Sequence, residues 1–558
     1  MKFSEMPYVR VDMEKLTEQY NDLTARFAAA KSGEEQWEIH QEQYALNKDV
    51  KTSMTLAHIR HSIDTTDTFY KAEKDFLDEN EPKLAELETR YQKQLLESPY
   101  RAYLEEKIGP VAFKSMEIAK KAFDPKLIPL MQEENALVTR YMSLLASAKI
   151  EWQGETLNLS LMRPYMIDAD RSVRKEAYRK ALAFFEENEE KLDDIYDQLV
   201  KNRTAQAKLL GMENYIELGY YRMNRNSYSR AEVERFRKQV KEIWVPFVTK
   251  IHEQRRQRIG VEKLTYYDAG VYFDYGNPAP QQDPAGIMEL GQKMYAELSP
   301  ETKEFFDFMM ENELFDVLGR KTKRSGGYMT YLPNYQAPFI FANFNGTAGD
   351  IDVITHECGH AFQGFVSGKD PILEHAEITM ETAEIHSMAM EFFTNDWMHL
   401  FFGEKAADFL KMQAEDSAIF IPYGTMVDEF QHIVYEKPDM TPAERKAVWA
   451  KLEKEYRPGI DDSENDYLAR GGFWQKQQHI YVNPFYYIDY CLAQSCALQY
   501  KMRMKEDFRR AWESYLKLCE LSAKKFYQPM LAEVGLKCPF DADCLKTLRQ
   551  GLEPVLLS

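Results

Sequence analysis

Residues 347–368 read TAGDIDVITHECGHAFQGFVSG. Apolar side chains recur in this stretch at spacings of three and four residues, as they do along a buried face of a helix. Thr347 or Asp350 is placed to cap the start of such a helix, and Gly368 can end it. We therefore expect a single helix over this stretch.

The centre of the stretch carries two histidines and a glutamate in the order His356-Glu357-xx-His360. Residues four apart share a helix face, so both imidazoles can reach one metal ion. Glu357 points about 100° away, toward a water that such an ion would bind. This spacing predicts a zinc-peptidase site with Glu357 as its base, although a chance match on an ordinary core helix has to be weighed against it.

The third metal ligand decides between those two interpretations, because catalytic zinc needs three protein ligands and one open position. A motif that continues to a third histidine would need glycine at 363 and histidine at 366, whereas Gln363 and Val366 stand there. The remaining solution is a carboxylate on a later helix, which we expect over residues 376–399. The acids of that segment are Glu377, Glu381, Glu384 and Glu391. The last three lie nearly on one face that is otherwise Met, Ala and Phe, which a solvated surface explains poorly.

Just before the motif, residues 325–345 read SGGYMTYLPNYQAPFIFANFN. The aromatic content, with a Pro333-Asn334 turn between two extended pieces, predicts a small sheet. Ser325, Gly326, Gly327 and Tyr328 could form an exposed edge that binds an extended peptide backbone, with a plain hairpin turn equally open. The expected fold is thus mostly α, with one small sheet next to the metal-binding helix.

The remaining sequence is largely helical in pattern and contains no linker or repeat. Apolar stripes mark two helices of the first ~185 residues, and a capping box starts a later one. The residues concerned are Leu16, Tyr20, Leu23 and Phe27; Leu84, Leu87, Tyr91 and Leu95; and Ser229 with Glu232. We expect an N-terminal helical region over 1–185 and a catalytic domain over 186–558.

Composition narrows the function further. The 558 residues are 44% hydrophobic with a net charge of −19, which disfavours binding to nucleic acid or to an anionic membrane. Six scattered cysteines form no C-x-x-C pair, so free thiols are expected. No secretory signal and no run of 18 apolar residues occur, and we expect a cytoplasmic protein.

Three blocks together resemble the thimet oligopeptidase and oligoendopeptidase F family of zinc peptidases, closest to its bacterial members. They are HECGHAFQ at 356–363, ETAEIHSMAME at 381–391 and HIYVNPFYYIDY at 479–490. The resemblance implies one zinc ion per chain, held by His356, His360 and Glu384. Glu381 and Glu391 then support the ligands. It also implies an elongated two-lobed helical body with a deep channel that admits short peptides.

The third block resembles the tyrosine-rich strip of that family. It implies that His479 orients the substrate and that Tyr486 and Tyr487 contact it. Tyr490 is the first choice to donate a hydrogen bond to the carbonyl oxygen as charge develops there, with His479 next. A tyrosine-rich core helix is the competing interpretation of this block.

The sequence departs from the family at two places. Gln363 stands where a histidine is frequent, and the glycine pair Gly471-Gly472 lies before His479 instead of after it. The expected activity is zinc-dependent hydrolysis of short oligopeptides at internal bonds. A related helical zinc carboxypeptidase or dipeptidyl carboxypeptidase is the alternative, and a non-catalytic peptide-binding protein is a more distant one.

Overall fold

The structure is a computed structural model that describes residues 1–320, 322–324 and 326–557. Its chain divides into two compact units, each built from three separate segments. Unit 1 contains 1–121, 280–403 and 503–536, and unit 2 contains 122–279, 404–502 and 537–558. The boundary expected near residue 185 stays a prediction.

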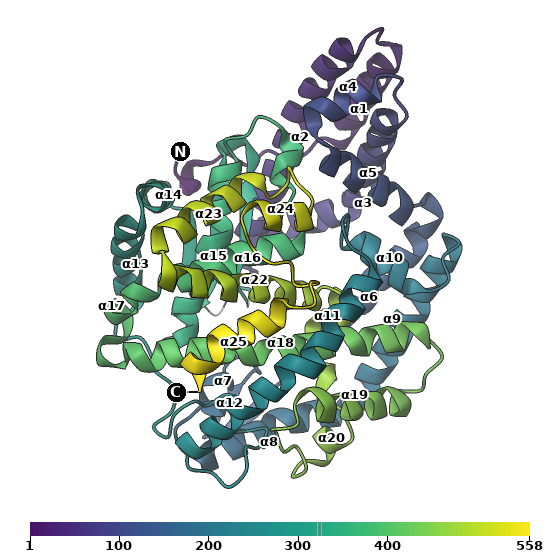
Figure 1. Ribbon diagram of the computed structural model, residues 1–558. Coiled ribbons are helices and arrows are strands. Elements are labelled where there is room, and N and C mark those ends of the chain that lie inside the picture. The colour runs from purple at the N-terminus through teal and green to yellow at the C-terminus, as the bar shows by residue number, and fades with distance from the viewer. Residues whose placement is uncertain (321, 325, 558) are drawn as a thin grey trace. The chain divides into compact units, whose positions relative to one another are not determined.

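Unit 1 carries most of its residues in helices, drawn in purple, teal and yellow-green in Figure 1. Its helices are α1 (Met13–Ala29), α2 (Gly33–Ile63), α3 (Thr68–Leu96), α4 (Arg101–Ile108), α5 (Pro110–Ala122), α13 (Pro284–Leu298), α14 (Pro300–Glu311), α15 (Ala348–Ser367), α16 (Met380–Phe393), α17 (Met398–Phe402), α23 (Phe508–Leu521) and α24 (Tyr527–Glu533). The two apolar stripes expected near the N-terminus are buried on α1 and α3, where they pack into a common core.

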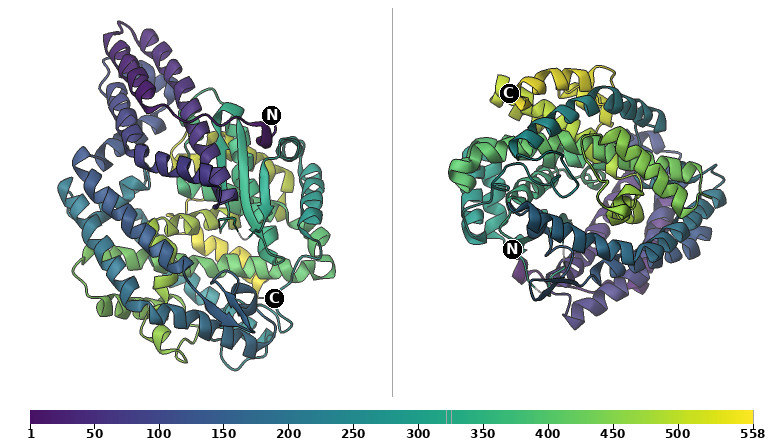
Figure 2. Two further views of the ribbon diagram at one scale, coloured as in Figure 1. Left: turned by 180° about the vertical axis from the view of Figure 1, so that it is seen from behind. Right: turned by 90° about the horizontal axis from the view of Figure 1, so that it is seen from below.

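A three-stranded sheet lies in unit 1, and Figure 2 shows it from behind with α2 beside it. Its strands are β3 (Phe315–Leu318), β4 (Tyr328–Leu332) and β5 (Ala337–Phe344), in the order β3-β5-β4. β4 and β5 are antiparallel and joined by the expected turn at Pro333. The sequence pattern missed β3, which pairs parallel to the central β5 and therefore comes from outside the hairpin.

The sheet positions the helix that carries His356 and His360, because β5 runs through a short loop into α15. The carboxylate of Asp350 accepts hydrogen bonds from the backbone N–H of Asn345 at 2.9 Å and of Gly346 at 2.7 Å. Asp350 thus fixes the loop instead of capping the helix, whose N-cap position is taken by Thr347. The helix ends at Gly368 as expected.

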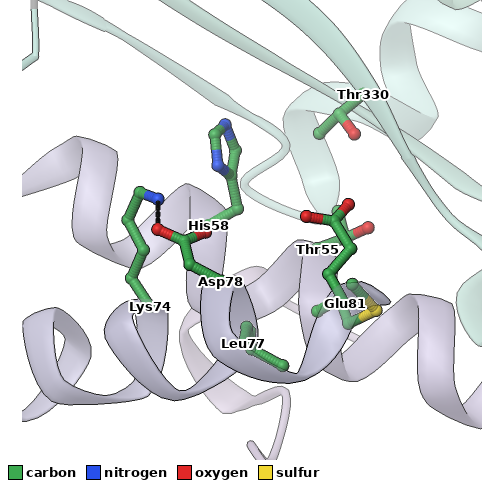
Figure 3. Close-up of a pocket in the computed structure, with 8 residues that line it drawn as sticks. Thr55, His58, Lys74, Leu77, Asp78, Glu81 and Thr330 are labelled. Carbon is green, nitrogen blue, oxygen red and sulfur yellow. Dashed lines mark hydrogen bonds and ion pairs between the residues drawn. The ribbon is translucent and has the colours of Figure 1, made fainter. Parts of the chain in front are cut away.

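A small polar cavity of about 250 Å³ lies between α2, α3 and β4 (Figure 3). Lys74 and Asp78 form an ion pair at its wall, and Thr330 of β4 closes it. It contains none of the residues singled out in the sequence.

Unit 2 is also helical. Its helices are α6 (Ile128–Ala146), α7 (Arg163–Met166), α8 (Arg171–Glu187), α9 (Glu189–Leu209), α10 (Tyr215–Arg222), α11 (Arg230–Gln239), α12 (Val245–Arg258), α18 (Ala406–Glu436), α19 (Pro442–Tyr456), α20 (Asp466–Ala469), α21 (Gln478–Val482), α22 (Tyr487–Glu506, whose last residues belong to unit 1) and α25 (Cys544–Leu556). The capping box of Ser229 and Glu232 starts α11 as expected. Within the described part of the chain, no helix combines the length and the apolar character that crossing a membrane requires.

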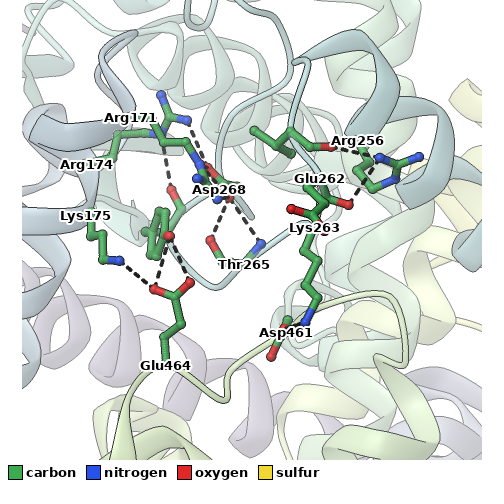
Figure 4. A network of polar contacts seen from close by, with 12 residues as sticks. Arg171, Arg174, Lys175, Arg256, Glu262, Lys263, Thr265, Asp268, Asp461 and Glu464 are labelled. Carbon is green, nitrogen blue, oxygen red and sulfur yellow. Dashed lines mark hydrogen bonds and ion pairs between the residues drawn. The ribbon is translucent and has the colours of Figure 1, made fainter.

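Two features of unit 2 were not expected. A hairpin of β1 (Ile150–Trp152) and β2 (Glu155–Leu157) turns at Gln153 and Gly154, both with positive φ. A buried polar network surrounds Asp268, whose carboxylate accepts hydrogen bonds from Arg171, Arg174 and Thr265 (Figure 4). It fastens α8 to the segment that follows α12.

Candidate metal centre

Helices α15 and α16 bring two imidazoles and one carboxylate to a common point. Oε2 of Glu384 lies 3.4 Å from Nε2 of His356 and 3.5 Å from Nε2 of His360. One donor atom from each of the three residues lies within 4.8 Å of the other two. This is the expected trio, and the structure brings it together without Glu381 or Glu377.

The two helices can approach so closely because residue 359 is glycine. A Cβ placed on Gly359 would stand 2.6 Å from the backbone oxygen of His386 and 2.6 Å from Cα of Ser387. Real Cβ atoms do not make contacts that short with backbone. Gly359 was not singled out in the sequence, and only its position between the two histidines could have drawn attention to it.

Glu384 is almost fully buried, with its side chain 4% exposed. Oγ of Ser387 donates a hydrogen bond to Glu384 Oε2 at 3.1 Å and so fixes the carboxylate. Burial alone would raise the pKa of Glu384, but the adjacent His360 and His356 imidazoles outweigh it and hold that pKa well below the usual range. The surroundings therefore favour the ionised form of Glu384.

His356 is oriented from its other ring nitrogen. Nδ1 of His356 lies 2.7 Å from Oε1 of Glu391, so Nδ1–H donates to that carboxylate and Nε2 is the ring nitrogen that faces Glu384. Burial disfavours the protonated ring, but hydrogen bonds to Glu384 and Glu391 outweigh it and raise the pKa of His356 well above its usual value. Glu391 was expected to support a ligand; it contacts His356, and its role at a metal site stays a prediction.

These observations fit a bound metal cation. Two imidazole nitrogens and one carboxylate oxygen form a three-donor set, and a carboxylate behind one imidazole is the usual arrangement at metal sites. The two carboxylates also place surplus negative charge in a site that is mostly closed to solvent. A cation at the three donors compensates that charge.

Of the other acids predicted near the site, Glu357 and Glu381 lie on the two helices, whereas Glu377 does not. Glu357 follows His356 on α15 and is half-buried, and Glu381 is buried in the first turn of α16. Glu377 was expected on the same helix, but α16 begins only at Met380, and Glu377 instead pairs with Lys51 at 2.8 Å. The single helix expected over 376–399 is therefore wrong at both ends, since α17 follows α16 after a break.

The tyrosine-rich strip lies in unit 2, where α21, a tight turn and the first turn of α22 gather its rings. The ring centroid of Tyr490 lies 4.8 Å from that of Tyr486 and 5.6 Å from that of Tyr487. The imidazole of His479 lies 4.9 Å from the Tyr487 ring and 5.9 Å from the Tyr490 ring. All four side chains are half-buried, so they are not ordinary core residues.

Two residues that the sequence did not single out orient His479. The amide of Gln477 donates to Nδ1 of His479 at 3.0 Å, while its oxygen accepts from the hydroxyl of Tyr423 at 2.8 Å. With Nδ1 as acceptor, the neutral imidazole carries its proton on Nε2. No sequence spacing signals this pair, because Tyr423 comes from the distant α18.

The glycines before β4 are exposed, as expected for an edge. Gly326 has φ +97, and its carbonyl accepts a hydrogen bond from the Asn343 side chain at 2.9 Å. Tyr328 begins β4 and stacks on Phe341 with ring centroids 4.9 Å apart. Ser325 lies outside the described residues.

Comparison with known proteins identifies the family of the chain. The model of the Peptidase M3 N-terminal domain matches residues 3–123, and that of Peptidase family M3 matches residues 165–550. The oligoendopeptidase F homolog of Borreliella burgdorferi is 23% identical over 436 residues, covering 74% of this chain and 72% of that relative.

Solved structures match over the whole chain. The solved structure of PZ peptidase A with an inhibitor superposes with a TM-score of 0.96 at 48% identity, and the match covers 100% of this chain and 99% of that chain. A Bacillus anthracis protein provisionally described as oligoendopeptidase F superposes with a TM-score of 0.91 at 43% identity. This match covers 100% of this chain and 98% of that chain. The fold, the three-donor site and the family match are consistent with one another: the chain belongs to peptidase family M3, and it is a metalloendopeptidase that hydrolyses oligopeptides.

Proposed function

We propose that the metal is zinc, one ion per chain, and that its ligands are His356, His360 and Glu384. The observation that carries this proposal is the gathering of the three donor atoms within 4.8 Å. Two histidines and one glutamate are a donor set typical of catalytic zinc, and these three side chains would hold the ion. A bound zinc ion supplies Lewis acidity, which makes a water molecule acidic near neutral pH and polarises a carbonyl group.

We assign the proton transfers to Glu357. Its side chain projects about 100° around α15 from His356, so it cannot share the face of the two imidazoles. A half-buried carboxylate next to the donor set can take a proton from the attacking water and deliver it to the leaving amine. Glu357 thus acts first as base and then as acid.

The tyrosine-rich strip of unit 2 is proposed to contact the substrate and to assist the reaction. We propose that Tyr490 donates a hydrogen bond to the carbonyl oxygen as negative charge develops there. His479 orients the substrate, and Tyr486 and Tyr487 contact it. The Nε2–H tautomer of His479 supports its role, because it provides a hydrogen-bond donor.

We further propose that the substrate backbone pairs with β4, the strand reached through Gly326, Gly327 and Tyr328. β4 is an outer strand of its sheet, and Tyr331 faces Pro338 across the ladder. The N–H of Ile340, which faces Met329 across the ladder, donates to the carbonyl of Leu314 on the other side, so the alternation of an antiparallel ladder turns the backbone groups of Met329 and Tyr331 outward. These groups can pair with an extended peptide, so the edge gives affinity without side-chain specificity.

A metal-exchange experiment tests the zinc assignment. The purified protein is stripped with a chelator, and cleavage of internally quenched peptides is followed as single metals are added back. Recovery with stoichiometric zinc is expected, and recovery with magnesium alone would refute the assignment. Peptides with an amidated C-terminus should still be cut internally.

A peptide series tests the β4 assignment. Backbone N–H groups of one substrate are methylated one at a time. We expect KM to rise at positions two residues apart and little in between, and a uniform response would count against strand pairing. The substrates are short peptides, and the six free cysteines support a cytoplasmic location.

A further inference from the structure

We propose that Arg225 is a positioning residue for the tyrosine strip, holding the turn from which Tyr486 and Tyr490 project. This proposal rests on the proposed catalytic role of Tyr490. Arg225 follows α10 in unit 2 and lies more than 250 positions before the strip, so no spacing in the sequence connects them.

The turn between α21 and α22 adopts an unfavourable backbone conformation. Phe485 has φ +69, in the left-handed region that non-glycine residues with bulky side chains avoid. Such a conformation persists only where the surroundings impose it, and it is found preferentially at functional sites. Phe485 immediately precedes Tyr486, so its backbone angles set the direction in which the strip leaves the turn.

Both polar groups of the Phe485 backbone are held by buried side chains. Its N–H donates to Oε1 of Gln431 on α18 at 2.9 Å, and its carbonyl accepts a hydrogen bond from Nη2 of Arg225. The Phe485 ring fills a space left by Gly219 of α10, where an added Cβ would stand 2.5 Å from the ring. The turn is therefore fixed through its backbone and its side chain together.

The same guanidinium also reaches the start of α22. Nη2 of Arg225 lies 3.3 Å from Oδ1 of Asp489, the residue before Tyr490, and the hydroxyl of Tyr228 donates to the same oxygen at 2.9 Å. The side chains of Arg225 and Asp489 are 0% and 1% exposed. Arg225 further lies over the ring of Tyr220, 4.2 Å from its centroid.

One charged group thus joins both ends of the segment 485–489. Burying two charged side chains costs free energy that their attraction often does not recover. A buried pair such as Arg225 and Asp489 is therefore better explained by a need for exact orientation than by a gain in stability. If the contact is lost, Phe485 can relax toward an ordinary backbone conformation, and the hydroxyl of Tyr490 shifts with α22. A displacement of about 1 Å at a catalytic group can cost roughly 10²-fold in rate.

The test is a comparison of Arg225→Met with a matched control, Arg174→Met. Arg174 is likewise buried and paired with a buried aspartate of unit 2, Asp268, at 3.0 Å (Figure 4). Its other hydrogen bonds go to the backbone carbonyls of Asp168, Ala169 and Tyr267, which lie outside the strip. We expect Arg225→Met to lower kcat tenfold or more with KM nearly unchanged, and Arg225→Lys to recover part of the loss. Arg174→Met should lower stability without this selective loss of kcat.

A double variant decides whether the effect passes through Tyr490. If Arg225 acts by positioning that hydroxyl, Arg225→Met adds little to the loss caused by Tyr490→Phe. Losses that multiply, or an Arg225→Met enzyme with a kcat no lower than that of the control, would overturn the proposal. Gln431→Met removes the other hydrogen bond of the turn and should give the same pattern, so the proposal stays testable if Arg225→Met does not fold.

The catalytic role of Tyr490 and the positioning role of Arg225 can be refuted separately. A normal kcat for Tyr490→Phe means that the catalytic role of Tyr490 is wrong, and the positioning proposal is overturned with it. A low kcat for Tyr490→Phe together with normal Arg225→Met and Gln431→Met enzymes means that only the positioning proposal is wrong. Metal content is measured for every variant and should remain at the level of the unmodified protein.

Discussion

Nδ1 of His356 and Oε1 of Glu391 lie 2.7 Å apart although 35 positions separate the two residues. The carboxylate sets the tautomer of the imidazole and makes Nε2 a better electron donor. We expect Glu391→Ala to weaken metal binding by about 10- to 100-fold, as the loss of such a partner usually does. Competition with a metal-sensitive dye measures this, and Glu391→Gln, which keeps an acceptor oxygen without charge, should fall in between. Unchanged affinity in both variants would separate Glu391 from the site.

Glu384→Ala should release the metal, whereas Glu381→Ala should keep it with altered affinity. Glu384 places an oxygen within 3.5 Å of both imidazole nitrogens, while Glu381 lies in the same helix without belonging to the donor trio. The measurement is metal content after dialysis against a mild chelator. An empty Glu381 variant beside a loaded Glu384 variant would reverse the ligand assignment.

Glu357→Gln should abolish turnover and leave the metal in place. The amide keeps the size of the side chain but cannot accept the proton of the attacking water, so we expect a loss of about 10²-fold or more in kcat. Metal content and kcat are measured on the same sample. Parallel loss of both would show that Glu357 helps to hold the metal.

Gly359→Ala should separate α15 from α16. Both nearest atoms are backbone, so the helices must move, and overpacking of this kind costs about 1–3 kcal/mol. We expect a lower denaturation midpoint and weaker metal binding. The matched control is Gly364→Ala on the same helix, where the added Cβ would meet the Tyr331 ring at an ordinary 3.5 Å. The idea fails if both variants behave alike.

Tyr490→Phe should lower kcat roughly a hundredfold, or about 3 kcal/mol, with KM nearly unchanged. The hydroxyl is expected to donate only when charge has built up on the carbonyl oxygen, and the ring that packs against Tyr486 remains. Tyr487→Phe, one helical turn away, should affect KM more than kcat. Near-normal turnover in Tyr490→Phe would assign that side chain to packing and leave His479 as the next candidate.

The features that could be predicted from sequence are those fixed by local spacing. The α15 helix, its two histidines, the β4–β5 turn and the capping box of α11 all follow from patterns within about twenty residues. β3 was missed because its partner is supplied by a strand that follows in the chain after β4. The β1–β2 hairpin was missed because Gln153-Gly154 is a weaker turn signal than Asn-Gly.

The parts of the site that could not be predicted depend on contacts across the chain. Residues 376–399 have the composition of one helix, yet α16 starts at Met380, and this leaves Glu377 outside it to pair with Lys51 of α2. Gln477 and Tyr423 share a hydrogen bond over 54 positions, and Arg225 reaches Asp489 over 264. Spacing in the sequence does not predict contacts over such separations, because these contacts are determined by how the helices pack in the folded chain.

The discontinuous make-up of unit 1 affects when the enzyme can become active during its synthesis. α16 is held from behind by residues made late: the imidazole of His386 contacts Oγ of Ser522 at 2.7 Å, and its carbonyl accepts a hydrogen bond from Tyr515 at 2.9 Å. Ser522 follows His386 by 136 positions, which a ribosome needs roughly 7–27 s to add. A nascent chain that already carries His356 and His360 therefore lacks the residues that hold α16 from behind, and we expect it to gain activity only after Ser522 has been made.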